Sequence, residues 1–288
     1  MSTNLLQDKI RKTKCPILVD LSMQPSHIPA KVTEEFPCQA DALFHVYSQL
    51  LPALKGIVPG VRFSFTQWAM MDALQQLRQL LALATELGFY VLLDAPAART
   101  PWEVKSAAQL LEEGSGYACH GLITDAFIGG DAIKPLVPYC EKGKSVFFMV
   151  RTPNKTAPDL QDLITGSRLA HLAAADLVNR FAEPIFSNGG YSPMGVLTSA
   201  TNANAVQGIR SRFKRIFLLV DGLDYPGGNG KNASLGFDRF GHGCVVSVGP
   251  EITAAWQKEE NGEGDYVALA VKAAERIRNN FTRYFSIL

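Results

Sequence analysis

Eight short apolar runs alternate with helix-like patterns along the 288 residues, and this alternation is the feature that most constrains the fold. The runs are residues 17–20, 57–65, 89–94, 121–125, 145–151, 194–199, 216–221 and 244–248. Short and nearly continuous apolar runs are typical of parallel strands buried on both faces. The pattern therefore predicts an α/β fold with a parallel sheet.

The segments between these runs have the periodicity of amphipathic helices. Apolar residues recur every three or four positions over residues 68–87, and Thr100 followed by Pro101 is typical of a helix start, with the helix reaching about residue 113. Residues 169–181 and 266–285 are also predicted to be amphipathic helices.

The strand–helix alternation predicts a single (β/α)8 TIM barrel over residues 1–288, with a doubly wound sheet as the alternative. Within it we expect an N-terminal helix over residues 1–14 and a C-terminal helix over about 265–286. Three long polar or glycine- and proline-rich segments are expected to be strand-to-helix insertions: residues 152–167, 183–193 and 223–232.

Composition excludes several classes of protein. The formal net charge of +1 argues against a general nucleic-acid binder, which usually has a basic excess. No apolar stretch approaches the roughly 20 residues needed to cross a bilayer, so we expect no membrane association. The N-terminal segment lacks the apolar core of a signal peptide, and the five cysteines contain no Cys-x-x-Cys pair. We therefore expect a cytoplasmic protein with reduced thiols.

Polar and charged side chains gather at the ends of the predicted strands. They are Asp20, Arg62, Asp94, Asp125, Arg151, Thr198, Ser199, Asp221, Ser247 and Gly249. Catalysis and binding in TIM barrels occur where strands end and the following loops begin. The set predicts a ligand-binding mouth, although each member taken alone could equally form an ion pair or cap a helix.

A glycine-rich segment, residues 221–230, follows the seventh predicted strand. Its backbone N–H groups could bind an anion, because barrels often hold phosphate after strands seven and eight, but such segments are also ordinary turns. It lacks the Lys-Ser/Thr ending of a P-loop. The five histidines are isolated and predict no metal site, and no Gly-x-Ser-x-Gly nucleophile motif occurs.

Four segments resemble the longer bacterial form of the orotidine 5'-monophosphate decarboxylase family. They are residues 83–95, 150–163, 190–201 and 218–228, and the likeness runs in order from about Leu6 to the C-terminus. This resemblance implies a (β/α)8 barrel that is usually a homodimer and needs no cofactor.

The residues at the family's catalytic positions differ. The family motif Asp-x-Lys-x-x-Asp aligns with Asp94 to Arg99, so that Asp94 remains, Pro96 stands at the lysine and Arg99 at the second aspartate. The resemblance implies that this lysine protonates the carbanion and that the second aspartate reaches the site across the dimer. It also places Arg62 at the lysine of strand two and keeps Asp20 at a ribose-contacting position.

Ligand-holding positions differ as well. Pro153 aligns with the serine that reads the pyrimidine, Pro226 with the phosphate-loop glutamine, and the phosphate arginine falls near Pro250. We expect catalytic positions at Asp94 and Arg62, with Pro96 and Arg99 degenerate. The expected ligand-binding residues are Asp20, Asp125, Arg151, Thr152, Asp221, Gly227, Gly228 and Ser247.

These replacements predict a divergent barrel with absent or very weak orotidylate decarboxylation, since neither proline nor arginine can supply a proton near neutral pH. It would bind a nucleotide or phosphoribosyl ligand, or pair as a homodimer or as a heterodimer with an intact homologue. Two alternatives remain open. The carboxylates could hold Mg²⁺ or Mn²⁺ for new chemistry, although a salt-bridge network with the arginines is favoured, or the chain could be an intact decarboxylase.

Overall fold

The fold is a closed barrel of eight parallel strands, as seen in a computed structural model that describes residues 2–186, 190–260 and 262–288. The strands occur in the order β1-β10-β9-β8-β5-β4-β3-β2, and β2 pairs with β1 to close the ring. They are β1 (Ile17–Asp20), β2 (Gly60–Ser64), β3 (Tyr90–Asp94), β4 (Gly121–Asp125), β5 (Ser145–Met149), β8 (Met194–Ser199), β9 (Leu218–Asp221) and β10 (Cys244–Val248). The predicted TIM barrel is confirmed, and the doubly wound alternative is wrong because the sheet has no open edge.

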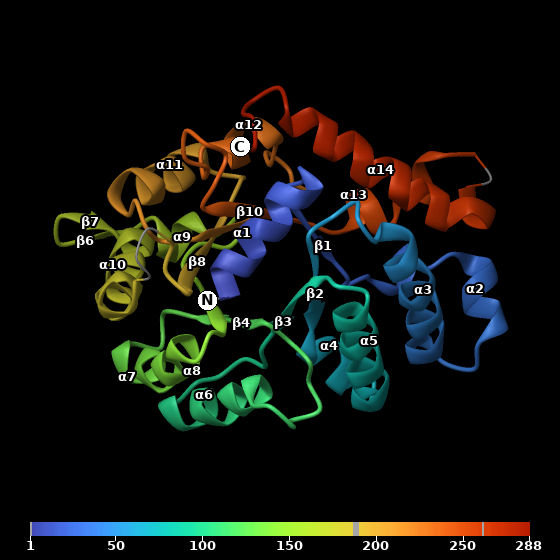
Figure 1. Ribbon diagram of the computed structural model, residues 1–288, viewed down its shortest axis with the longest axis horizontal. Helices are drawn as coiled ribbons and strands as arrows, with labels where there is room; N and C mark the ends of the chain where they lie inside the picture. Colours follow the sequence, from blue (N-terminus) through green and yellow to red (C-terminus); the bar gives the residue numbers. More distant parts are fainter. Residues whose placement is uncertain (1, 187–189, 261) are drawn as a thin grey trace.

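Helices form an outer ring around these strands (Figure 1). They are α2 (Ala30–Glu35), α3 (Gln39–Leu54), α4 (Phe65–Met70), α5 (Leu74–Glu86), α6 (Pro101–Ala108), α7 (Gly130–Ile133), α8 (Val137–Glu141), α9 (Pro158–Gln161), α10 (Ala170–Ala182), α11 (Ala203–Arg212), α12 (Gly230–Ser234), α13 (Pro250–Thr253) and α14 (Tyr266–Phe281). Their apolar faces cover the outward-facing strand residues and form the larger of two buried clusters. Among the described residues, no helix is both long and apolar enough to cross a membrane.

The barrel interior is a packed apolar layer. It contains Leu18, Tyr90, Leu92, Ile123, Phe147, Leu197, Phe217, Leu219 and Val245. Gly195 faces the same space, where a Cβ atom would lie 2.7 Å from the Phe147 ring and 2.6 Å from a backbone oxygen. A glycine here makes room for a large aromatic side chain, so the interior is filled and any ligand must bind above it.

Helix α1 (Ser2–Thr13) crosses one end of the barrel, in front of the strands in Figure 1. Its Leu6 and Ile10 are fully buried in the interior cluster. The Ser2 hydroxyl lies 2.5 Å from the Tyr90 hydroxyl, which in turn lies 2.6 Å from Ser145 Oγ. The helix therefore closes this end, and the opposite end carries the strand carboxyl termini.

Several predicted elements have different bounds in the structure. The predicted helix over residues 68–87 is divided into α4 and α5, because Asp72 between them adopts a left-handed backbone (φ 53°). Helix α14 ends at Phe281, before the predicted end, and α3 was not predicted as a helix.

The three predicted loops contain short elements. The first includes α9 and a small hairpin of β6 (Ile164–Thr165) and β7 (Arg168–Leu169). The last runs into α12. Part of the second, residues 187–189, lies outside the described residues.

Candidate functional site

The alternation of each strand places its terminal polar residue inside the barrel mouth. Leu18, Leu92 and Leu219 face the interior. On each of these strands, and on β4 and β10, a polar residue lies two positions after an interior residue. These polar residues are Asp20, Asp94, Asp125, Asp221 and Ser247, and Arg62 likewise lies two positions after Gly60 on β2. Because side chains two apart on a strand share a face, these polar groups form the layer directly above the apolar interior.

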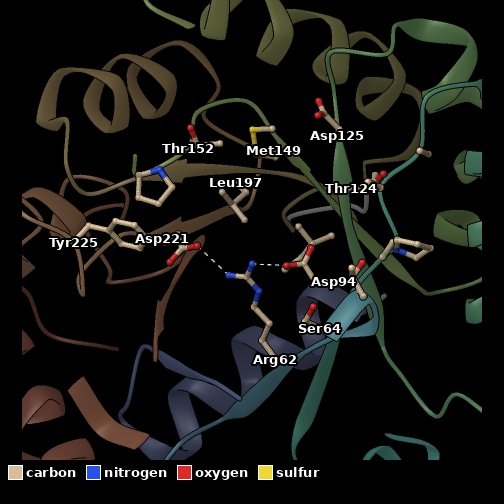
Figure 2. A pocket seen from close by; sticks show the side chains of 17 residues that line it. Arg62, Ser64, Asp94, Thr124, Asp125, Met149, Thr152, Leu197, Asp221 and Tyr225 are labelled. Atoms are coloured by element: carbon tan, nitrogen blue, oxygen red, sulfur yellow. Dashed lines mark hydrogen bonds and ion pairs between the residues drawn. The ribbon is translucent and has the colours of Figure 1, made fainter. Parts of the chain in front are cut away.

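Arg62 is the centre of this layer and joins its own strand, β2, to four others. Its Nη2 lies 2.5 Å from Asp94 Oδ2, and its Nη1 lies 3.0 Å from Asp221 Oδ2. The same Nη1 is 3.4 Å from Asp20 Oδ2 and donates a 3.3 Å hydrogen bond to Ser247 Oγ. Figure 2 shows the guanidinium pointing between Asp94 and Asp221. The arginine is thus held from several sides in a fixed position.

The burial of this network shifts the pKa of its members. Burial raises the pKa of Asp20 to about 6, with the nearby Arg62 acting in the opposite direction. Burial alone would lower the pKa of Arg62, but Asp20, Asp94 and Asp221 together outweigh it and the net shift is upward. Arg62 therefore stays charged at every relevant pH. Asp20 Oδ1 and Arg62 Nε are buried without a hydrogen-bond partner among the described residues.

A cavity of about 390 Å³ opens above the network (Figure 2). One wall is apolar and is contributed partly by Pro96, Ile123, Met149 and Leu197, whereas the polar side carries carboxylates and hydroxyls. The lining residues are Arg62, Ser64, Thr66, Asp94, Ala95, Pro96, Ala97, Ala98, Ile123, Thr124, Asp125, Met149, Thr152, Pro153, Leu197, Asp221 and Tyr225. A mixed lining of this size suits one small organic molecule.

Arg151, expected to bind ligand, is directed into the protein instead. Its Nε and Nη2 bond both carboxylate oxygens of Asp162 at 3.0 and 2.9 Å, and it is buried. His171 Nδ1 lies 3.0 Å from the same carboxylate, and the Arg151 guanidinium is the main cause that lowers the pKa of Asp162. Arg151 does not line the cavity, whereas the adjacent Thr152 does.

Three backbone N–H groups of the glycine-rich loop after β9 have acceptors inside the loop. Gly222 donates to Asp221 Oδ1 at 2.7 Å, Tyr225 donates to the Gly222 carbonyl, and Gly228 donates to the Tyr225 carbonyl. Gly228 allows a tight turn, because a Cβ there would lie 1.8 Å from the Gly222 oxygen. Gly227 has a left-handed backbone with φ 88°. The structure therefore gives these two glycines a conformational role in the loop.

Asp224, in the same loop, was missed by the sequence reasoning. Its Oδ2 accepts a 2.8 Å hydrogen bond from the Gly249 N–H and its Oδ1 a 2.8 Å bond from the Glu251 N–H, both in the segment after β10. Burial raises the pKa of Asp224, while these two N–H groups act to lower it. An acid inside the glycine-rich segment was the available signal, but its partners are far away in sequence.

The chain is similar in sequence and in fold to one group of known proteins. A curated orotidine 5'-phosphate decarboxylase from Clostridium acetobutylicum is 25% identical over 98% of this chain and 99% of the relative. Over nearly its whole length the chain is similar to orotidine 5'-phosphate decarboxylases. Solved structures share the fold: an orotidine 5'-monophosphate decarboxylase from Plasmodium berghei aligns with TM-score 0.75 at 14% identity over 97% of this chain and 99% of that one. An OMP decarboxylase from Leishmania donovani gives TM-score 0.71 at 20% identity over 96% and 99%. No family model matches the sequence.

Relative to the orotidine 5'-phosphate decarboxylase pattern, the segment after β3 carries no amine. Pro96 and its alanine neighbours line the cavity, while Arg99 is exposed and outside the lining, its backbone N–H bonded to Glu103. Among the lining residues of the described chain, the one basic side chain is Arg62. The cavity therefore presents the Arg62 guanidinium, which is held by carboxylates, and no amine at Pro96, where the resemblance implies a lysine.

The carboxylates of the mouth are arranged around the arginine rather than around a common point. Among the residues that the structure describes, no group of three or more histidine, cysteine, aspartate or glutamate side chains is placed to hold a metal ion. Asp20, Asp94 and Asp221 instead contact Arg62. Of the salt-bridge network expected from the sequence, the structure shows the part formed by Arg62, whereas Arg151 pairs with Asp162 and Arg99 is exposed. Asp125 stands apart and accepts a 2.7 Å hydrogen bond from the Phe127 N–H.

Proposed function

We propose that this chain is a non-decarboxylating member of the orotidine 5'-phosphate decarboxylase family that binds a small molecule in its barrel mouth. The observation that carries the proposal is the position of Arg62. It is the sole basic group lining the described cavity and is bound by three carboxylates. The family resemblance supplies the expectation of a lysine at Pro96, where no titratable group exists.

The chemistry follows from proton availability. Protonation of a developing carbanion needs an acid whose pKa lies near the operating pH. Arginine has a pKa above roughly 12 in water, and the surrounding carboxylates raise the pKa of Arg62 further. Arg62 can therefore stabilise negative charge by its field, but it cannot give up a proton.

Asp20 is the acid of the Arg62 network whose pKa is raised, to about 6, chiefly by burial. It lies behind Arg62 and does not line the cavity, so it is not placed to deliver a proton to a bound ligand. These features together support ligand binding without the family's reaction.

The test is conversion of orotidine 5'-phosphate to UMP by the purified full chain, followed by ultraviolet absorbance. We expect no conversion above the buffer control at micromolar protein over hours. Conversion that disappears in Asp94→Ala, with unchanged circular dichroism, would overturn the proposal. Conversion that persists in Asp94→Ala would indicate a contaminating enzyme, and the purified variant thus serves as the internal control.

The nature of the ligand is also a proposal. The resemblance suggests a nucleotide or phosphoribosyl compound, and the apolar wall beside carboxylates and hydroxyls is compatible with a base and a sugar. Isothermal titration calorimetry with UMP, uridine and orotidine 5'-phosphate tests it directly. Tight binding of any of them supports this ligand class, whereas silence across all three favours the partner role described next.

A second candidate function is pairing with another barrel of the family, as a homodimer or with an intact homologue. Large apolar side chains are exposed in the segments that follow β2, β3 and β4: Met70 at the end of α4 (83%), Trp102 at the start of α6 (74%) and Phe127 after β4 (47%). Large exposed apolar side chains that gather into a patch are typical of interaction surfaces. Light scattering after gel filtration, compared between the wild type and the double variant Met70→Lys/Trp102→Lys, tests this pairing, and a monomeric wild type would contradict the homodimer.

We also propose the cytoplasm as the compartment, because all five cysteines are free thiols.

A further inference from the structure

The segment after β10 holds an anion that belongs to the protein itself. The N–H groups of Gly249 and Glu251 both point to the carboxylate of Asp224, each at 2.8 Å. Pro250 between them has no N–H to offer. Asp224 comes from the loop after β9, so the carboxylate bridges the loops that follow the seventh and eighth barrel strands.

These two loops are where TIM barrels commonly hold a phosphate, using backbone N–H groups. Here five of the backbone donors in these two loops already have acceptors within the protein, two of them the Asp224 carboxylate. The N–H groups of Gly222, Tyr225 and Gly228 donate within the β9 loop, and Pro226 lacks one. A phosphate would have to displace the Asp224 carboxylate and would meet it as a neighbouring negative charge.

The negative charge of the barrel mouth also opposes the binding of a phosphate. Asp94, Asp125 and Asp221 line the cavity and Asp20 lies behind it, against the single guanidinium of Arg62. Charges in a partly enclosed cavity interact more strongly than on an open surface, so a doubly charged phosphate is repelled there. Carboxylates and hydroxyls also accept hydrogen bonds, and they favour a ligand that donates them.

We infer that Asp224 closes the phosphate position of this barrel, and that the mouth takes an unphosphorylated ligand that is rich in hydrogen-bond donors and neutral or positively charged. This rests on the proposed function only in taking the mouth as a ligand site. The inference changes the expected ligand from a nucleotide to a compound of the same kind without a phosphate, such as a nucleoside.

The first experiment measures inorganic phosphate binding by calorimetry and thermal shift at fixed ionic strength. We expect no binding by the wild type at millimolar phosphate, and at least a tenfold gain in affinity in Asp224→Ala, which frees both N–H groups. Asp125→Ala is the matched control, because it removes one mouth carboxylate but leaves the Asp224 contacts in place. Its affinity for phosphate should rise much less than that of Asp224→Ala.

A gain in Asp125→Ala equal to that in Asp224→Ala, no gain in Asp224→Ala, or phosphate binding by the wild type overturns the inference. If Asp224→Ala does not fold, Asp224→Asn is used. It keeps an acceptor oxygen and removes the charge, and a smaller gain in phosphate affinity is expected.

The second experiment titrates the wild type with uridine and with UMP, which differ by one phosphate group. We expect uridine to bind at least as tightly as UMP, and UMP binding that is tenfold tighter overturns the inference. If neither uridine nor UMP binds, the phosphate titration of the wild type and the Asp224 variant alone supports or overturns the inference. Decarboxylation of orotidine 5'-phosphate would overturn the proposed function, whereas wild-type binding of phosphate without turnover would overturn only this inference.

Discussion

Arg62 and Asp94 form a 2.5 Å ion pair between the carboxyl ends of two neighbouring strands, β2 and β3. The arginine also contacts Asp20 and Asp221, so its removal leaves three partly buried acids without a counter-charge.

Replacing Arg62 by methionine should therefore destabilise the fold strongly. Removing one partner of a buried ion pair costs about 3 to 5 kcal/mol in the free energy of unfolding. Urea denaturation at pH 7.5 measures it. Arg99→Met is the control, because Arg99 is exposed and outside the cavity, and its cost should stay within about 0.5 kcal/mol. A loss below 1 kcal/mol in Arg62→Met would show that the network contributes little.

The buried carboxyl of Asp20 should make stability depend on pH. Its pKa is about 6 in the folded protein against 3.8 for an ordinary aspartate, so the folded state binds more protons between these values. The stabilising contribution is complete below about pH 3.8 and is lost as the pH rises through about 6.

This dependence is measured as the difference in unfolding free energy between the wild type and Asp20→Asn from pH 4 to 7.5. The difference should shift in favour of the variant by an amount on the order of 3 kcal/mol as the pH rises. Comparing the two proteins removes the opposite contribution of Asp162, whose pKa is lowered. A pH-independent difference would contradict the raised pKa of Asp20.

The bidentate pair between Arg151 and Asp162 should hold the loop after β5. Asp162→Asn removes the charge opposite a buried guanidinium, and we expect a loss of about 3 kcal/mol together with faster proteolysis between residues 152 and 169. Asp159→Asn is the control, since Asp159 is exposed on α9, the short helix that ends just before Asp162. Limited proteolysis and urea denaturation give the two readouts, and equal behaviour of the two variants would disprove the assigned role.

The interior position of Gly195 gives a packing test. Gly195→Ala places a methyl group 2.7 Å from the Phe147 ring, and such overpacking costs about 1 to 3 kcal/mol. Gly208→Ala lies on α11 with its nearest neighbour at 3.8 Å, and it should instead stabilise by about 0.5 to 1 kcal/mol. Adding Phe147→Leu to Gly195→Ala should recover part of the loss, whereas simple additivity of the two changes would argue against the contact.

The strands were predictable because burial on both faces leaves a continuous apolar run. The runs at 17–20, 121–125, 194–199 and 244–248 coincide with observed strands, while those at 57–65 and 216–221 begin earlier than β2 and β9. Residues that precede a strand in a buried turn are equally apolar, so composition does not mark the boundary. The break at Asp72 escaped the periodicity because one left-handed residue changes direction without changing the pattern.

The candidate site was predictable in position but not in pairing. Strand ends identified Asp20, Arg62, Asp94 and Asp221, which the barrel brings together. Arg151 has the same sequence context, yet its partner Asp162 lies in the following loop and draws it away from the cavity. A side chain's partner is set by tertiary distances, which the order of residues along the chain does not contain.

The pairing of β1 with β10 also determines when the protein can assemble. Ile17 lies opposite Val246, so the first strand to leave the ribosome must wait for almost the whole chain before its second neighbour exists. Until then both the β1 edge and the apolar face of α1 lack their final cover, and contacts so distant in sequence form slowly. The nascent chain therefore carries an unpaired strand edge through most of its synthesis, a state in which molecular chaperones have a defined segment to protect.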